Sequence, residues 1–287
     1  MTSQARRMYC LQYGAERVTK GLSMRGGSGA LYWEPLTGVV VDTEIGWVLL
    51  DTGMGRDALE DEANQRAYAQ AAASFGADPA ETEWHLHPAP TVSGRWNWGL
   101  PGDPLERALA QVGLSPGDIA LACVSHMHLD HSGGVPTLAG AGVPVAIQRA
   151  ELEFARSGVP TLDDGYRRQD WEHDGVAWRR LDGDVELAPG VWALSTPGHT
   201  PGHMSYRVDL PETGTWIFAM DAADLAQNLY DRVSPGSCAG GTPADEKLAD
   251  DSLDRLLSEA RRLSGRLIPG HDQIVHNAIR HPAGGHR

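Results

Sequence analysis

The first part of the chain carries the apolar and polar pattern of a β-hairpin. Residues 38–41 form an apolar run, residues 42–46 are typical of a turn, and residues 47–50 form a second apolar run. From about residue 62 to 99 this pattern loosens into an Ala-rich, helix-like stretch and then a loop that contains Trp96 and Trp98. We interpret residues 62–99 as an insertion that lies near the functional site.

Short apolar runs recur through the rest of the chain and alternate with helix-like segments. Polar or turn-rich sequence separates them, and no Pro/Ser-rich or charge-run linker divides the chain into halves. A single mixed α/β domain over residues 1–287 is therefore expected. Strands are predicted at 119–124, 143–148, 191–195, 204–208, 216–220 and 266–268, and helices at 105–112, 149–156 and 249–263.

Composition and charge narrow the classes of partner. The net charge of −14 opposes nucleic acid, since that binding needs clustered Lys and Arg to neutralise phosphates. No stretch approaches the roughly 18 apolar residues that span a bilayer, so no membrane segment is expected. Residues 1–10 lack the apolar run of a secretory signal, which predicts a cytoplasmic protein. The expected partner is a small molecule, and a homodimer is compatible with the sequence.

The strongest chemical signal is a cluster of four potential metal ligands directly after the predicted strand at 119–124. His126, His128 and His131 can converge there, while Asp130 can turn its carboxylate toward a neighbouring ion. Imidazole nitrogens with a carboxylate oxygen form a ligand set suited to zinc. A His-rich surface loop is the competing interpretation. It is disfavoured because the cluster follows a buried strand and ends in a Gly pair that permits a tight turn.

This cluster resembles the HxHxDH signature of the metallo-β-lactamase superfamily, whose fold is a four-layer αβ/βα sandwich. Further blocks resemble the same superfamily: Asp-Thr-Gly at 51–53, Thr-Pro-Gly-His-Thr-Pro-Gly-His at 196–203, Asp221, and Pro-Gly-His at 269–271. The match spans most of the chain. It implies a hydrolase of the α/β fold class with this sandwich architecture.

The resemblance also implies a site for two divalent metal ions. Asp51 and His203 correspond to outer positions that hold the ligands in place rather than bind metal. Zn²⁺ is the expected metal, although iron, cobalt or manganese also suit nitrogen and oxygen ligands. By resemblance, one ion is held by His126, His128 and His199, the other by Asp130, His131 and His271, and Asp221 bridges them.

Within the superfamily, residues 194–205 and the segment around Asp221 are similar to the quorum-quenching N-acyl homoserine lactonase group. In that group a metal-bridging hydroxide attacks the lactone carbonyl, and the counterpart of Asp130 passes a proton to the leaving ring oxygen. The resemblance thus implies an enzyme that hydrolyses ester bonds by opening an N-acyl homoserine lactone or a related lactone. Two alternatives stay open: a thioesterase or cyclase with the same two metals, and a non-catalytic binding relative, which the complete ligand set disfavours.

One position departs from the lactonase pattern. Those enzymes commonly place a tyrosine three residues after the bridging aspartate, and this chain has Asp224 there. An ionised carboxylate cannot donate to a carbonyl oxygen, so the donor is expected from Tyr230, the Trp-rich insertion or the metals. Asp224 is a possible substrate contact that could donate a hydrogen bond only if protonated, and a solvated acid at a helix start is the favoured interpretation. Trp96 and Trp98 either wall the substrate cleft or simply pack the loop onto the core.

Overall fold

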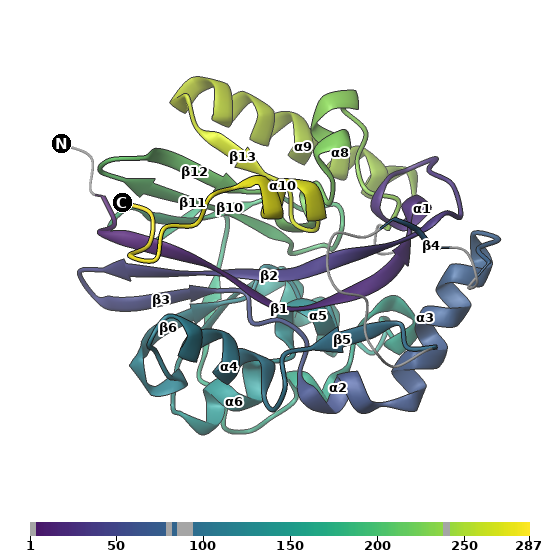
Figure 1. Cartoon of the computed structure of the whole chain (residues 1–287), viewed down its shortest axis with the longest axis horizontal. Coiled ribbons are helices and arrows are strands. Elements are labelled where there is room, and N and C mark those ends of the chain that lie inside the picture. Colours follow the sequence, from purple (N-terminus) through teal and green to yellow (C-terminus); the bar gives the residue numbers. More distant parts are fainter. Residues whose placement is uncertain (1–3, 79–81, 85–93, 238–241) are drawn as a thin grey trace.

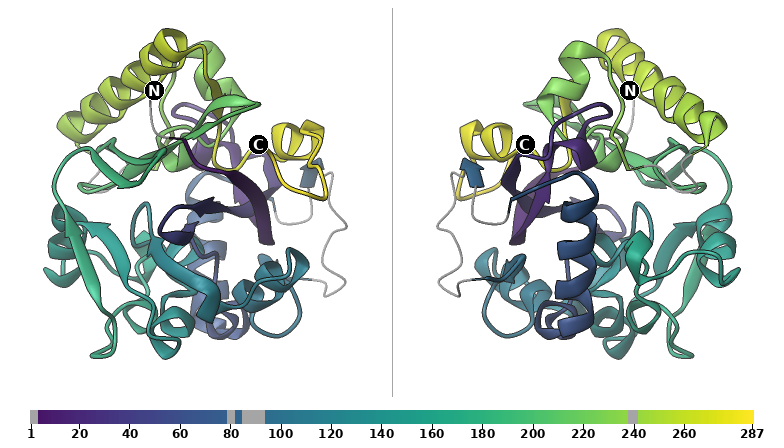
Figure 2. Two further views of the ribbon diagram at one scale, coloured as in Figure 1. Left: turned by 90° about the vertical axis from the view of Figure 1, so that its left-hand side faces the viewer. Right: turned by 90° about the vertical axis from the view of Figure 1, so that its right-hand side faces the viewer.

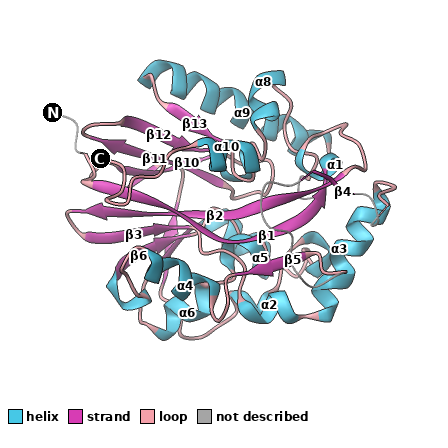
Figure 3. Cartoon of the chain, viewed as in Figure 1, coloured by secondary structure: helices cyan, strands magenta, loops and turns pink. Residues whose placement is uncertain are grey.

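Two β-sheets pack face to face between two layers of helices in the computed structural model of this chain, which describes residues 4–78, 82–84, 94–237 and 242–287 (Figures 1 and 2). Helix α4 (Pro104–Gln111) contacts β1 (Arg7–Thr19) on the outside of one sheet, while α9 (Pro243–Leu263) contacts β12 (Gly214–Phe218) and β13 (Arg266–Ile268) on the outside of the other (Figure 3). Each sheet is thus covered on both faces, which accounts for its nearly continuous apolar runs. The predicted four-layer αβ/βα sandwich is confirmed.

The first sheet has eight strands in the order β5-β1-β2-β3-β6-β7-β8, with β4 paired to β2. Its first four strands in that order are antiparallel, whereas β3, β6, β7 and β8 run parallel. The strands are β1 Arg7–Thr19, β2 Leu31–Thr43, β3 Gly46–Leu50, β4 Thr82–Trp84, β5 Asn97–Gly99, β6 Ile119–Cys123, β7 Val145–Gln148 and β8 Trp178–Leu181.

The second sheet has five strands in the order β13-β12-β11-β10-β9. It is antiparallel from β9 to β12, and β13 joins β12 in parallel. The strands are β9 Val185–Ala188, β10 Val191–Ser195, β11 Met204–Leu210, β12 Gly214–Phe218 and β13 Arg266–Ile268.

The helices are short except for α9, which runs for 21 residues. None of the described helices has the length and apolar character needed to cross a membrane. The helices are α1 Lys20–Ser23, α2 Arg56–Glu60, α3 Glu62–Ser74, α4 Pro104–Gln111, α5 Leu129–Ser132, α6 Val135–Gly140, α7 Arg149–Arg156, α8 Ala226–Asp231, α9 Pro243–Leu263 and α10 Gln273–Ala278.

One continuous apolar core lies between the sheets. It contains Val39 and Leu50 from the first sheet and Ala193, Tyr206 and Val208 from the second, all at most 3% exposed. Because side chains of both sheets are buried in the same cluster, each sheet is stabilised by packing against the other. The shared core supports the expectation of a single domain.

The predicted insertion contains regular structure as well as loop. Its first half is α3, capped by the Asp61 carboxylate, which accepts a hydrogen bond from the Ala63 amide. Its last residues form β5, which pairs with β1 at the edge of the first sheet. Residues 79–81 and 85–93 of the insertion lie outside the described part of the chain.

Candidate metal centre

Five loops that each follow the carboxyl end of a strand meet at one edge of the sandwich. β3 leads to Asp51, β6 to His126, β10 to His199, β12 to Asp221 and β13 to His271. Strands β3 and β6 run parallel, as do β12 and β13. Strands β10 and β12 both pair antiparallel with β11, so they run in the same direction as each other. Their carboxyl ends therefore point the same way within each sheet, which is where ligands commonly bind in α/β folds.

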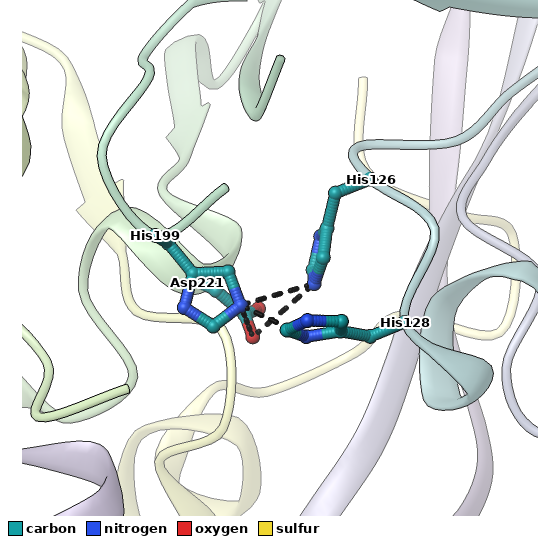
Figure 4. Close-up of side chains that lie close together, drawn as sticks. All are labelled: His126, His128, His199 and Asp221. Atoms are coloured by element: carbon teal, nitrogen blue, oxygen red, sulfur yellow. Dashed lines mark hydrogen bonds and ion pairs between the residues drawn. The ribbon is translucent and has the colours of Figure 1, made fainter. Parts of the chain in front are cut away.

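His126, His128, His199 and Asp221 form the first of two ligand groups (Figure 4). The Nε2 atom of His199 lies 3.2 Å from Nε2 of His126 and 3.0 Å from Nδ1 of His128. Asp221 presents its Oδ2 atom 3.3 Å from the same His199 nitrogen. Three imidazole nitrogens and one carboxylate oxygen thus converge on a single point.

Asp130, His131, His271 and again Asp221 form the second group. The Nε2 atom of His131 lies 2.8 Å from Oδ2 of Asp130 and 3.1 Å from Oδ1 of Asp221. The Nε2 atom of His271 is also 3.1 Å from Oδ1 of Asp221. Asp221 therefore directs one carboxylate oxygen to each group, which is the arrangement of a bridging ligand. The structure brings together all seven residues that the sequence singled out.

The hydrogen bonds behind the imidazole rings leave lone pairs pointing into these groups. The Nδ1 atoms of three rings face oxygen acceptors: Asp51 Oδ2 at 2.7 Å from His131, the Ser237 carbonyl at 2.7 Å from His199 and the Pro35 carbonyl at 3.1 Å from His271. In the neutral tautomer that donates these bonds, each Nε2 is an acceptor that faces other acceptors. Such an array is stable only around cations, so the donor set fits divalent metal ions.

In the metal-free protein, the buried carboxylates and imidazoles of the two groups shift one another's pKa values. Burial lowers the pKa of His131, but the carboxylates of Asp130, Asp221 and Asp51 outweigh it and raise this pKa well above the ordinary value. The pKa of His271 is likewise raised by Asp221 against the effect of burial. Burial and the neighbouring His131 lower the pKa of His126 well below its usual range. The site therefore contains imidazoles with raised pKa values beside one with a lowered pKa, which agrees with a shortage of positive charge around the carboxylates.

A pocket of about 440 Å³ opens onto both groups and is lined by His128, Asp130, His199, Asp221 and His271. Apolar side chains complete its wall, among them Val18, Leu22 and Phe154. A cavity of this size suits a small organic molecule. The potential ligands are thus accessible to a substrate rather than sealed in the core.

A family model described as the metallo-beta-lactamase superfamily matches residues 33–271 of this chain. The chain belongs to the metallo-beta-lactamase superfamily. Two curated relatives are the N-acyl homoserine lactonase AttM of Azorhizobium caulinodans, 27% identical over 93% of each chain, and an N-acyl homoserine lactonase of Bacillus cereus, 30% identical over 83% of this chain and 81% of that one.

Solved structures of this superfamily agree with the fold described above. A crystal structure of a variant of the B. thuringiensis protein AiiA, with N-decanoyl-L-homoserine bound at its active site, has a TM-score of 0.76. It is 25% identical in sequence and covers 96% of this chain, which covers 97% of the other. The similarity in fold therefore extends over nearly the whole chain.

Asp51 lies behind the metal centre of this superfamily member and does not belong to either ligand group. Its carboxylate accepts from the Ser125 amide at 2.6 Å, from the Ser125 hydroxyl at 2.8 Å and from Tyr206 at 2.9 Å, besides facing His131. The residue adopts a left-handed φ of +59° to do so. Asp51 thus fixes both Ser125, directly before the HxHxDH motif, and the orientation of the His131 ring.

We expect Asp51→Asn to weaken metal binding in the second group. The asparagine amide would direct a donor toward the His131 Nδ1–H and remove its acceptor, so the affinity should fall about 10–100-fold, as for other outer-shell partners. Titration of the metal-free protein in competition with a chromophoric chelator measures this affinity. The control is Asp42→Asn on β2, which pairs with Arg7 away from the pocket. An affinity within twofold of the unmodified protein for Asp51→Asn would contradict the assigned role.

His203 supports the other side of the site. Its Nε2 atom accepts from the Asp221 amide at 3.1 Å, and its Nδ1 atom lies 3.0 Å from the Thr196 carbonyl. Burial lowers the pKa of His203 to about 3, in keeping with a neutral ring that accepts at Nε2. His203 therefore positions the backbone of the bridging residue, as expected of an outer support.

Glu151 also holds the site loops in place, a role that the sequence did not reveal. This buried residue of α7 accepts four hydrogen bonds, from the Met127 amide, the Tyr166 hydroxyl, the Thr200 hydroxyl and the Gly202 amide. It thus ties the HxHxDH loop to the loop that carries His199. Nothing in the local sequence of α7 distinguishes Glu151 from its exposed neighbour Glu153.

We expect Glu151→Gln to lower the free energy of unfolding by about 3 kcal/mol, since the new amide nitrogen faces two buried donors that lose their acceptor. Glu153→Gln, two residues along the same helix and exposed, should change it by less than about 0.5 kcal/mol. Denaturant unfolding of the metal-free variants provides both values. Equal stability of the two variants would mean that the Glu151 contacts do not hold the loops together.

Three of the predicted substrate contacts are wrong. Tyr230 is 91% exposed on α8 and lies outside the pocket. Trp96 is 7% exposed and packs with Leu31 and Ala72 in a separate apolar cluster. Trp98 lies in β5, where it pairs with Ala15 of β1. Neither indole lines the pocket, so the interpretation that they pack the loop holds. The insertion instead reaches the pocket through α3, with Asn64, Ala67, Tyr68, Ala71 and Ala72.

The interpretation of Asp224 as a solvated acid is also wrong. Its side chain is only 3% exposed and lines the pocket, because its backbone carbonyl accepts a hydrogen bond from the His271 amide beside the two ligand groups. Glu16 and Glu34, which the sequence analysis did not single out, line the same pocket. Their strands hold them there: Glu16 on β1 lies opposite Glu34 on β2. A carboxylate thus does occupy the position where lactonases commonly have a tyrosine, and it is buried.

Proposed function

We propose that this chain is a two-metal hydrolase that opens a lactone ring, with an N-acyl homoserine lactone or a related lactone as substrate. The observation that carries the proposal is the Asp221 carboxylate, which directs one oxygen to each ligand group at the base of an open pocket. The curated relatives named N-acyl homoserine lactonases support the choice of a lactone over other esters.

The two ligand groups define what each residue holds. His126, His128 and His199 would bind one ion, Asp130, His131 and His271 the other, and Asp221 both. Two divalent ions in such a site supply a hydroxide at neutral pH and polarise a carbonyl oxygen. Nitrogen and carboxylate donors in this ratio favour Zn²⁺ as the resident metal.

Asp130 is the residue that we assign to proton transfer. Its carboxylate lines the pocket, and its Oδ2 atom lies 2.8 Å from the Nε2 atom of His131. Burial raises the pKa of Asp130, but His131 outweighs that effect and lowers it, so the group is ionised and can take up the proton that the attacking water loses. It can then donate that proton to the ring oxygen as the ester bond breaks.

Metal content and lactone opening, measured on one sample, test the proposal. The purified protein is analysed for bound metal and then assayed by the fall in pH with short- and long-chain homoserine lactones and one aromatic lactone. About two metals per chain with rapid opening of a lactone is the expected result. Two metals without opening of any lactone would move the substrate to another ester or a thioester, and fewer than one metal would overturn the hydrolase.

A further inference from the structure

Three buried carboxyl groups line the pocket without belonging to either ligand group: Glu16, Glu34 and Asp224, here called the acidic wall. They are 6%, 2% and 3% exposed. Glu16 and Glu34 face each other across β1 and β2, within hydrogen-bonding range of one another. Asp224 is held beside the metal centre because its carbonyl accepts from the His271 amide at 2.9 Å. The acidic wall is thus a fixed part of the pocket.

The protein supplies hydrogen-bond donors to only part of this wall. The Tyr68 hydroxyl donates to Glu16, and the Tyr32 hydroxyl donates to Glu34 at 2.7 Å. In contrast, Oδ1 of Asp224 is buried and has no hydrogen-bond partner among the described residues. Buried polar atoms in folded proteins are nearly always paired, so an unpaired carboxylate oxygen in a pocket indicates a ligand.

The chemistry of that ligand follows from the acidic wall itself. Ionised carboxylates only accept hydrogen bonds, and an ammonium has three donors and no acceptor. Burial raises the pKa of Glu16, Glu34 and Asp224, and a positive charge beside them would favour their ionised forms. The neighbouring Arg17 guanidinium also lines the pocket, but it stacks over the Trp96 ring, 5.3 Å from its centroid. The net charge of −14 would further draw a cation toward this cleft.

We propose that the acidic wall binds a positively charged group, an ammonium or a guanidinium, on the substrate whose ester carbonyl lies at the metal centre. The inference rests on the proposed function and specifies its substrate class as a cationic lactone or ester. Apolar side chains such as Val18, Leu22 and Ala71 line the same pocket and can contact the chain that links the two groups. A neutral fatty acyl chain would leave the Asp224 oxygen without a partner.

Binding of two matched ring-opened products tests this independently of turnover. N-(6-aminohexanoyl)-homoserine and N-heptanoyl-homoserine have chains of equal length that end in an ammonium and a methyl group. Calorimetry on the metal-loaded protein should give a Kd at least about tenfold lower for the ammonium compound, a modest value for a close charge pair. Equal affinities, or no binding of the ammonium compound, would overturn the inference.

Charge-neutral variants then locate the preference. Asp224→Asn and Glu34→Gln retain shape, and each should reduce the ratio of the two affinities at least fivefold. Asp251→Asn removes an exposed carboxylate on α9 that pairs with Lys247, and it should leave the ratio within twofold. A parallel assay with the two corresponding lactones distinguishes failure of the proposed function from failure of this inference. A preference for the ammonium compound without ring opening would contradict the proposed function. Ring opening without that preference would contradict only this inference.

Discussion

Asp221→Asn should lower kcat/KM for lactone opening by on the order of 10³-fold and reduce bound metal from two ions per chain to one or fewer. Asp221 is the only residue shared by both ligand groups of the described chain. Its two oxygens lie within 3.3 Å of imidazole nitrogens on both sides. An asparagine retains one oxygen acceptor, but it lacks the negative charge and cannot bind two cations equally.

The matched control is Asp231→Asn, an exposed carboxylate at the end of α8. Metal analysis after dialysis and initial rates on the same preparation give both readouts. Full activity with two metals in Asp221→Asn would show that the bridging geometry is not needed. Loss of activity with two metals retained would assign Asp221 to the chemical step instead of metal binding.

The parts of this molecule that the sequence predicted are those encoded locally. The strand at 119–124 and the HxHxDH loop are continuous in sequence, so an apolar run followed by histidines predicts both the element and the ligands at its end. The hairpin of β2 and β3 was recognisable for the same reason, although β2 begins seven residues earlier, at Leu31, than the apolar run suggests. The four-layer fold came from the resemblance that those motifs carry.

The missed parts depend on contacts between distant segments. β1 does not alternate cleanly, because Gly14, Ala15 and Glu16 are buried in succession beside a bulge, and it was not predicted as a strand. The partnership of Glu16 with Glu34 and Tyr68 therefore had no signal in the sequence. The prediction of Tyr230 as a substrate contact failed because nearness to Asp221 in sequence does not fix where a side chain points, and on α8 this side chain is exposed at the surface.

Asp130→Asn separates the two roles that the proposed mechanism gives this residue. If Asp130 protonates the departing oxygen, kcat for an oxygen lactone should fall about 10³-fold, within the usual range for general acid catalysis. The thiolactone with the same acyl chain should lose at most about tenfold, because a thiolate leaves without prior protonation. Single-substrate kinetics on preparations that retain two metals provide this comparison.

The comparison of leaving groups distinguishes proton transfer from metal binding because both substrates use the same pocket. The control is Asp164→Asn, which removes an exposed carboxylate that lines the pocket. Asp164 accepts its hydrogen bonds from Thr161, so this variant should affect both substrates alike. An equal loss for both substrates in Asp130→Asn would make Asp130 a metal ligand alone. The short distance from Asp130 to His131 would then serve only to place the carboxylate at the second metal.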